Sequence, residues 1–146
     1  MAMADGGRRV FEFSFRVPYA DIDQMGFVYY ANYLVYFEMA RSHLLREAGI
    51  PYPELEKRGV FLPVVEAVCR YRKSAYYDDL LTVHSRCEGV EGTRLKIAYE
   101  IRRSDCGTQG KGEVDDLIVT GHTVHVCLSR DGKVLRPVPE IVKLAE

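Results

Sequence analysis

The chain has 146 residues, 47% of them hydrophobic and 28% charged, with a formal net charge of −1 at pH 7. That length suits a single domain with a real apolar core. The charge balance lacks the basic excess that binding of nucleic acid or of an anionic membrane usually requires. We therefore expect neither nucleic acid nor a membrane as a partner. The sequence has no stretch of about 18 apolar residues, so no transmembrane helix is expected.

The N-terminal segment and the cysteines indicate an ordinary reduced protein. Residues 1–9 are small and charged without the apolar segment of a signal peptide, and we expect a mobile tail there. Residues 10–146 then form one domain. The four cysteines include no CxxC pair, and we interpret them as reduced thiols of a cytoplasmic protein rather than as a disulfide framework.

Residues 10–17 show the two-residue periodicity of a half-buried strand. Apolar and polar side chains alternate along this segment, with Phe11, Phe13, Phe15 and Val17 set against Glu12, Ser14 and Arg16. Pro18 ends the strand because proline cannot donate to a strand ladder. Residues 19–30 contain two aspartates and Gly26 and are predicted to form a loop.

A helix is predicted over residues 33–48, followed by a stop signal. Apolar residues recur there at spacings of three and four: Phe37, Ala40, Leu44 and Ala48. Gly49 and Pro51 then end the helix. Because residues 33–37 are apolar almost all round, we expect a central helix that is covered on most sides. A short second helix is expected over residues 52–58.

The second half of the chain reads as four long strands, at residues 60–73, 80–91, 93–104 and 114–129. Short turns separate them, so neighbouring strands are expected to pair antiparallel. The last residues, 139–146, are expected to form a helical turn. These patterns predict an α+β fold in which one curved antiparallel sheet wraps around one long central helix. The open edges of such a sheet predict at least a dimer.

The loop before the long helix has the outline of an acyl-transfer site. It carries two carboxylates and a glycine and leads into a helix start, where the first amides lack internal partners and attract an oxyanion. A carboxylate beside such amides can act on a carbonyl group that they hold. The alternative is structural, because an Asp-x-Asp segment with glycine is common in turns and a carboxylate is a routine helix cap.

The same stretch resembles the signature of the 4-hydroxybenzoyl-CoA thioesterase-like family, which has the hot-dog fold. Residues 21–33 read Asp-Ile-Asp-Gln-Met-Gly-Phe-Val-Tyr-Tyr-Ala-Asn-Tyr, with Tyr-Phe-Glu at 36–38 and Arg41 behind them. Downstream, Tyr71 with the Asp-Asp-Leu of residues 78–80, and the segment 121–126, resemble the family's later strands. The resemblance extends over residues 10–142.

The resemblance assigns roles to individual residues of this loop. It implies that Asp23 is the catalytic carboxylate and that Asp21 fixes the loop by bonding backbone amides. The backbone amide at Tyr30 would meet the thioester oxygen, and Gly26 and Val28 are the further candidates for oxyanion or substrate binding. Glu38, within the helix, is a weaker candidate for a chemical role.

Coenzyme A carries phosphate groups, and the chain offers basic residues that could meet them. Arg72, Lys73 and Arg94 are the candidates, although charge on the outer face of a strand is usually plain solvation. We expect no cofactor, since CoA belongs to the substrate. We also expect no metal, because His122 and His125 are three residues apart and point to opposite faces of one strand.

These observations predict an acyl-CoA thioesterase that hydrolyses a short-chain or aromatic acyl-CoA to the free acid and CoA. Asp23 would act either as a general base toward water or as a nucleophile. Two alternatives stay open: a thioesterase acting on acyl carrier protein, and a non-catalytic hot-dog protein that binds acyl-CoA. A homodimer or homotetramer is expected.

Overall fold

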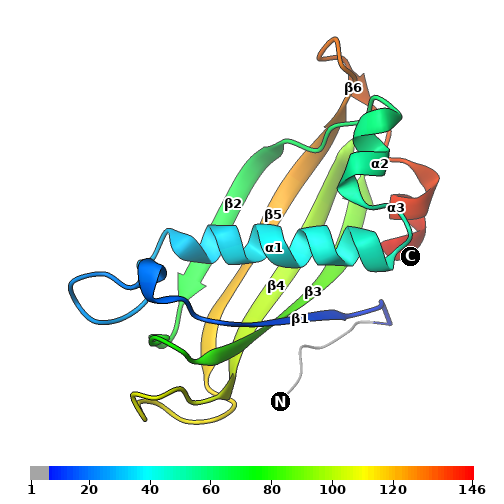
Figure 1. Ribbon diagram of the computed structural model, residues 1–146. Coiled ribbons are helices and arrows are strands. Elements are labelled where there is room, and N and C mark those ends of the chain that lie inside the picture. Colours follow the sequence, from blue (N-terminus) through cyan, green and yellow to red (C-terminus); the bar gives the residue numbers. More distant parts are fainter. Residues whose placement is uncertain (1–6) are drawn as a thin grey trace.

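The computed structural model describes residues 7–146 (Figure 1). Its elements in chain order are β1 (Phe11–Arg16), the 3₁₀ turn η1 (Tyr19–Asp21), α1 (Asn32–Glu47), α2 (Tyr52–Lys57), β2 (Val64–Tyr71), β3 (Leu80–Glu91), β4 (Arg94–Asp105), β5 (Leu117–Leu128), β6 (Val134–Leu135) and α3 (Pro139–Leu144). Each predicted strand and helix is present, and β6 is an addition.

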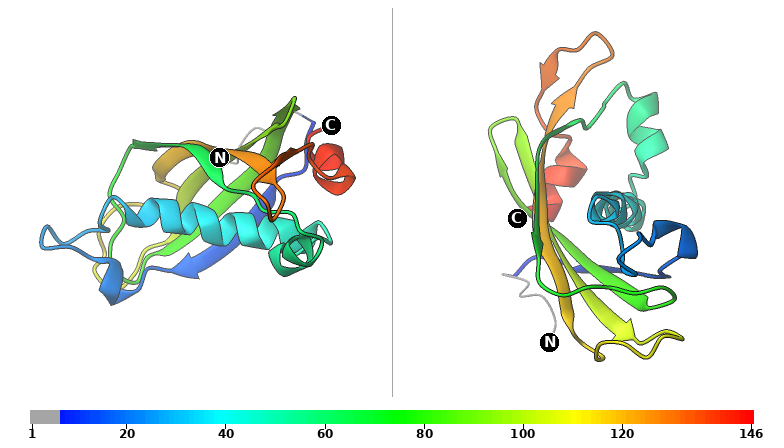
Figure 2. Two further views of the ribbon diagram at one scale, coloured as in Figure 1. Left: turned by 90° about the horizontal axis from the view of Figure 1, so that it is seen from above. Right: turned by 90° about the vertical axis from the view of Figure 1, so that its left-hand side faces the viewer.

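The strands form one antiparallel sheet in the order β1-β3-β4-β5-β2, with the short β6 beside β5. The long helix α1 lies across one face, and the sheet curves around it (Figure 2). The views show no helix of the described chain on the opposite face. The predicted α+β arrangement of a curved antiparallel sheet around one long helix is therefore confirmed. β1 and β2 are the edges of the sheet.

A glycine in the sheet lets the helix come close. Phe37 of α1 lies over Gly121 of β5, where an added Cβ would stand 2.8 Å from the phenyl ring and 2.1 Å from the Val68 carbonyl oxygen. The Phe37 ring also stacks on Tyr99 of β4, with centroids 4.3 Å apart and planes at 6°. No side chain other than hydrogen fits at position 121, so this contact sets the height of α1 above the sheet.

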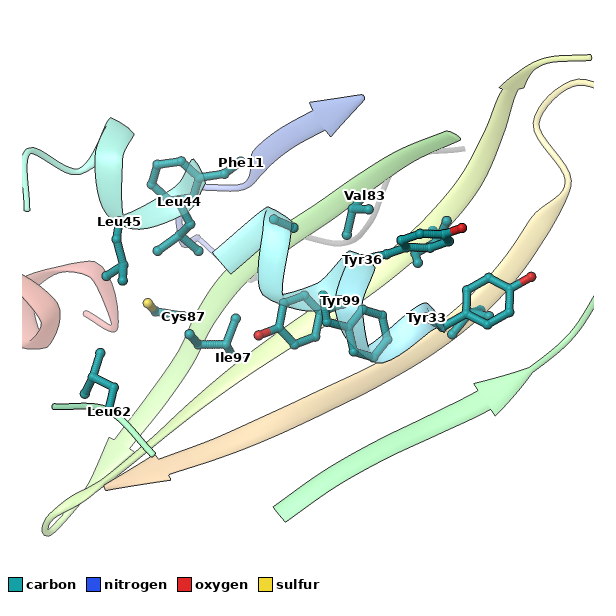
Figure 3. Close-up of a cluster of buried hydrophobic side chains, with 14 of the residues drawn as sticks. Phe11, Tyr33, Tyr36, Leu44, Leu45, Leu62, Val83, Cys87, Ile97 and Tyr99 are labelled. Carbon is teal, nitrogen blue, oxygen red and sulfur yellow. The ribbon is translucent and has the colours of Figure 1, made fainter. Parts of the chain in front are cut away.

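The core fills the space between α1 and the inner face of the sheet (Figure 3). Leu44 and Leu45 of α1 are buried at one end of the helix, near α2 and α3. At the other end Tyr33 and Tyr36 are buried, and their phenol oxygens point toward the helix start, whereas the hydroxyl of Tyr99 points the opposite way. The helix thus packs by its apolar stripe and directs two phenols at the loop before it.

Two strands begin later than the sequence predicts. β2 starts at Val64 because Pro63 has no N–H to donate and serves only as an acceptor, from the Val126 amide at 3.4 Å. β5 starts at Leu117 because the preceding residues turn back on themselves. There the Asp116 carboxylate accepts from the Glu113 amide at 2.9 Å.

The first half of α1 is less covered than predicted. Leu34 and Val35 are 42% and 49% exposed, since the chain lays only one side of the helix on the sheet. Val64 and Val65 of the edge strand β2 are exposed to a similar degree. The prediction of a helix covered on most sides is therefore wrong for a single chain, and these apolar residues are left for another surface.

The predicted mobile tail, residues 1–9, lies partly outside the described residues, which begin at Gly7. The described part is held against the domain: Arg8 Nε donates to the Ala145 carbonyl oxygen at 2.8 Å. The Arg9 guanidinium lies 4.3 Å from the centroid of the Phe11 ring.

A chain of polar groups runs through the core beneath α1. Arg41 Nη1 donates to the Tyr99 hydroxyl at 3.2 Å, and that hydroxyl lies 2.7 Å from Thr123 Oγ1. His125 is fully buried, with Nε2 at 2.8 Å from Thr123 Oγ1 and Nδ1 at 3.2 Å from the Leu62 carbonyl oxygen. The Leu62 carbonyl can only accept, so Nδ1 carries a proton. Because the pKa of His125 is lowered to about 4, the ring is neutral at pH 7, and Nε2 accepts from the Thr123 hydroxyl.

Burial lowers the pKa of His125 from 6.5 to about 4. The unfolded chain therefore takes up a proton before the folded chain does as the pH falls. The contribution of His125 to the free energy of unfolding is fully present above pH 6.5, and we expect about 3 kcal/mol to be lost between pH 6.5 and pH 4. Urea unfolding across this range measures the slope. The same measurement on His125→Gln should give a flatter slope, and equal slopes for the two proteins would contradict the assignment.

Candidate active site

The loop between β1 and α1 ends in a small hairpin that projects beyond the helix start (Figure 1). Ile22 and Val28 form an antiparallel bridge at its base. Inside it the Asp23 amide donates to the Phe27 carbonyl at 3.1 Å, and the Gly26 amide donates to the Asp23 carbonyl at 3.0 Å. Gly26 has a φ of +87°, a conformation that a side chain would strain, so this glycine allows the tight turn.

Asp21 fastens the hairpin to α1. Its Oδ2 accepts from the buried Tyr36 hydroxyl at 2.8 Å, and its carbonyl oxygen accepts from the Tyr29 amide at 2.9 Å and from Asn32 Nδ2 at 3.1 Å. Burial, and the hydrogen bond to Asp21, raise the pKa of Tyr36, so the phenol keeps the proton that it donates. Asp21 thus holds the loop as predicted, but the prediction that its carboxylate bonds backbone amides is wrong.

Asp23 is the carboxylate that forms the turn-type hydrogen bond. Its Oδ1 accepts from the Met25 amide at 2.8 Å, and within the described chain no hydrogen-bond donor meets Oδ2. A hydrogen bond with Tyr30 raises the pKa of Tyr29, and the charge of Asp23 adds to that rise. The two aspartates differ in what they bond: the Asp21 carboxylate is tied to the helix through the Tyr36 hydroxyl, whereas the Asp23 carboxylate bonds only an amide of its own turn and keeps Oδ2 free of donors among the described residues.

Most amides around the helix start already have acceptors. The hydrogen-bonded ones are those of Gly26, Val28, Tyr29, Asn32, Tyr33 and Leu34. Among residues 7–146 no acceptor is found for the amides of Tyr30 and Ala31. The predicted Tyr30 amide is therefore available as an oxyanion donor. The Gly26 amide is bound to the Asp23 carbonyl at 3.0 Å and the Val28 amide to the Ala75 carbonyl at 2.9 Å, so neither amide is unpaired, and a role of these residues in substrate binding stays a prediction.

A cavity of about 200 Å³ lies between the hairpin, the start of α1 and the end of β2. Its lining residues are Phe27, Val28, Tyr30, Tyr33, Tyr71, Arg72, Lys73 and Ser74. Four of the residues predicted from the sequence, Val28, Tyr30, Arg72 and Lys73, are thus brought together. Asp23 is not among the lining residues within one chain. Tyr33 and Tyr71 also line the cavity; neither was predicted from the sequence as a site residue, although Tyr71 belongs to the family resemblance.

Arg94 does not belong to this cavity. It pairs with Val126 at one end of β5, whereas the amide of Lys73 is bonded to Ile118 near the other end. Eight residues of strand between them span roughly 26 Å. Arg94 instead lines a larger hollow of about 540 Å³ at the β3–β4 turn, beside Glu88, Glu91 and other residues. Strand length therefore separates Arg94 from Arg72 and Lys73 within one chain, and a contact of Arg94 with CoA phosphate stays a prediction.

A buried cation holds the far wall of the cavity. Arg103 is 1% exposed and donates to Asp79 Oδ2 at 2.9 Å and to the Ser74 carbonyl at 2.5 Å. It also forms an ion pair with Asp116 Oδ2, and Asp116 Oδ1 accepts from the Lys73 ammonium nitrogen at 2.9 Å. This network fixes the segment after β2, against which the hairpin docks through Val28. Buried charges are tolerated there because they are paired.

Two further observations concern metal and membrane. In the part of the chain that the structure describes, no group of three or more His, Cys, Asp or Glu side chains is placed to hold a metal ion. None of the helices in residues 7–146 has the length and apolar character that a membrane crossing requires.

Comparison with known proteins gives the family. The model of the thioesterase-like superfamily matches residues 17–145. An acyl-CoA thioesterase of Haemophilus influenzae, YbgC, is 34% identical over 103 residues, which make up 70% of this chain and 74% of that protein. A 1,4-dihydroxy-2-naphthoyl-CoA hydrolase of Thermosynechococcus vestitus is 26% identical over 125 residues, 85% of this chain and 80% of that protein.

A crystal structure of a 4-hydroxybenzoyl-CoA thioesterase shares the fold, with a TM-score of 0.79, 19% identity and coverage of 94% of this chain and 99% of that chain. The chain belongs to the thioesterase-like superfamily. This membership confirms the resemblance found in the sequence, the hot-dog fold and the predicted enzyme class, a thioester hydrolase.

The hydrogen bond between Tyr36 and Asp21 should show as a coupling in stability. We expect Asp21→Asn and Tyr36→Phe each to lower the free energy of unfolding by about 1–2 kcal/mol, because each weakens or removes one buried, charge-assisted hydrogen bond. The double variant should cost clearly less than the sum, since both changes affect the same bond. Urea unfolding of the four proteins measures this. Strict additivity would show that the two residues act independently.

Proposed function

We propose that the protein hydrolyses acyl-CoA thioesters, with Asp23 as the reacting carboxylate and the Tyr30 and Ala31 amides as the oxyanion site. The observation that carries the proposal is the pattern of unused groups. In one short loop, Asp23 Oδ2 and the amides of Tyr30 and Ala31 lack partners among the described residues, and Tyr30 lines the cavity. The amides on either side of these two, those of Tyr29 and Asn32, are hydrogen-bonded. A thioester carbonyl bound at the amides would stand close to the carboxylate.

The chemistry follows from these groups. The amides stabilise the negative charge that grows on the thioester oxygen, an effect worth about 3 kcal/mol for each donor in comparable sites. As a general base, Asp23 takes a proton from water while the hydroxide adds to the carbonyl carbon. The tetrahedral species then collapses, the C–S bond breaks, and the leaving sulfur takes the proton back from Asp23, so that CoA departs as the thiol. As a nucleophile, the Asp23 carboxylate would instead add to the carbonyl carbon and expel the CoA thiolate, and water would then hydrolyse the resulting mixed anhydride to the free acid and regenerate Asp23.

The cavity favours a compact or aromatic acyl group. A volume of about 200 Å³ suits a ring or a short chain rather than a long one. Its walls are mostly aromatic, and the rings of Tyr33 and Tyr71 lie tilted against each other there, with centroids 5.7 Å apart. Rings of this kind pack well against another ring. The relative that acts on a naphthoyl-CoA agrees with this substrate class.

For the phosphates of CoA, Arg72 is the stronger of the remaining candidates. Within the described residues no acidic side chain pairs with Arg72, whereas Lys73 is already paired with Asp116 at 2.9 Å. An unpaired guanidinium at the cavity rim can meet a phosphate with two hydrogen bonds.

A second copy of the chain would complete this site. Asp23 projects from the chain on its hairpin, and the apolar side chains of Leu34, Val35, Val64 and Val65 lie exposed on α1 and on the edge strand β2. Pairing two β2 edges would cover these side chains and continue the sheet across the dimer. The minimal unit of the proposal is therefore a homodimer, which could pair again into a homotetramer.

Removal of the Asp23 charge tests the reaction. With benzoyl-CoA as substrate and thiol release as the readout, Asp23→Asn should lower turnover at least about a hundredfold without loss of the fold. Asp131→Asn, in an exposed turn, is the matched control and should keep full activity. The wild type should accept benzoyl-CoA and butyryl-CoA and disfavour palmitoyl-CoA and acyl carrier protein thioesters. A folded Asp23→Asn protein with wild-type turnover would refute the mechanism.

The oligomeric state can be measured by sedimentation and compared with activity in the same assay. We expect sedimentation at micromolar concentration to show a dimer or tetramer of the 16.7 kDa chain. A charge placed in the apolar surface, Val35→Glu, should shift the protein toward monomer and lower activity in parallel, because burying an unpaired charge is costly. Val134→Glu, on an exposed strand away from that surface, is the control. A stable, active monomer would overturn the dimer.

A further inference from the structure

Tyr71, the last residue of β2, contacts the helix start from a different part of the chain. Its hydroxyl donates to the Tyr30 carbonyl oxygen at 3.1 Å. The ring lies edge-on to Tyr30, with centroids 6.5 Å apart, and tilted on Tyr33 at 5.7 Å. The side chain is half exposed and lines the 200 Å³ cavity. The edge strand and the helix start thus share one hydrogen bond.

That hydrogen bond fixes the peptide group that carries the Ala31 amide. A peptide group is planar, and its N–H points away from its C=O. The carbonyl between Tyr30 and Ala31 is held by Tyr71, and otherwise only by the Tyr33 amide at 3.4 Å. The preceding peptide group, which carries the Tyr30 amide, has its carbonyl held by the Asn32 amide at 2.9 Å. Both unpaired amides therefore belong to peptide groups anchored at the carbonyl end.

Loss of the Tyr71 hydroxyl would leave the carbonyl of the Tyr30–Ala31 peptide group with only the 3.4 Å hydrogen bond from the Tyr33 amide. The first turn of a helix frays readily when its groups lack partners. A hydrogen bond to a carbonyl also polarises the N–H of the same peptide group. Burial raises the pKa of Tyr71 to about 12, and the neighbouring Cys69 thiol adds to the rise, so the phenol stays a donor throughout the neutral range.

We propose that Tyr71 is a positioning residue for the reaction: its hydroxyl holds the Tyr30–Ala31 peptide so that the Ala31 amide, beside the Tyr30 amide, meets the thioester oxygen in the transition state. This inference rests on the proposed function. A role of this kind acts on the developing charge rather than on substrate affinity.

Tyr71→Phe tests the inference because it keeps the ring and removes only the hydroxyl. With benzoyl-CoA we expect kcat to fall about tenfold while KM changes less than about twofold, the pattern of an interaction made in the transition state. Tyr19→Phe, on an exposed ring in the same loop, is the matched control and should leave both constants unchanged. Thermal unfolding of both variants verifies that the fold is intact.

Nuclear magnetic resonance of the protein without substrate gives a second readout. The amide nitrogen of Ala31 senses the hydrogen bond on the carbonyl it is joined to. Its resonance should move in Tyr71→Phe and stay in place in Tyr19→Phe. A moved resonance with wild-type kcat would show that the hydrogen bond exists without serving the reaction. A lowered kcat with an unmoved resonance would assign the phenol to direct contact with the substrate. Either result overturns the positioning role.

The proposed function fails separately. If Asp23→Asn keeps wild-type turnover, the reaction itself is wrongly assigned. If Asp23→Asn is inactive and Tyr71→Phe keeps wild-type kcat, only the inference about Tyr71 is lost.

Discussion

The contact of Phe37 with the bare backbone of Gly121 determines where the long helix sits, and the site depends on that placement. With hydrogen as the only side chain at position 121, α1 lies low on the sheet and its phenyl ring stacks on Tyr99. Tyr36, the residue before Phe37, is then at the right height to donate to Asp21, and Tyr33, one turn earlier than Phe37, packs on Tyr71 at the end of β2. These contacts and the tight turn at Gly26 together shape the loop that carries Asp23.

Two opposite requirements meet in this loop. Groups that hold its shape must be fully hydrogen-bonded, because a loose loop cannot position a reacting carbonyl. Groups that act on a substrate must be left unpaired. The two aspartates are bonded differently: the Asp21 carboxylate ties the loop to the helix through the Tyr36 hydroxyl, whereas the Asp23 carboxylate bonds only an amide of its own turn. The buried Arg103 network provides the matching support on the side of the cavity where Val28 docks.

Much of this could be predicted from the sequence. The alternation in residues 10–17 and the three- and four-residue spacing in residues 33–48 follow directly from burial of one face, so both elements were found. Pro63 shows where prediction from the hydrophobic pattern fails. Proline hardly disturbs the pattern of apolar and polar side chains, but it has no N–H for the strand ladder, so the predicted strand began too early. Leu34 and Val35 were expected to be covered because apolar side chains are usually buried. The sequence pattern does not show whether the same chain or a second chain buries them, and in the single chain they are exposed.

The site was predicted in part for the same reason. Asp23 and Tyr30 were reached through the family signature, which is local in sequence. The Tyr36–Asp21 bond joins residues fifteen apart, the Tyr71–Tyr30 bond joins residues forty-one apart, and both depend on how α1 crosses the sheet. Arg94 and Arg72 were grouped because both are basic; the residue type does not show at which end of the sheet each one lies.

The central claim is that the thioester carbonyl binds between the Asp23 carboxylate and the amides at the start of α1. A crystal structure of the Asp23→Asn protein soaked with benzoyl-CoA would test it most directly. The account predicts the thioester oxygen within about 3 Å of the Tyr30 or Ala31 amide nitrogen, with the side chain at position 23 beside the carbonyl carbon. A thioester bound elsewhere, such as in the hollow at the β3–β4 turn, would contradict it.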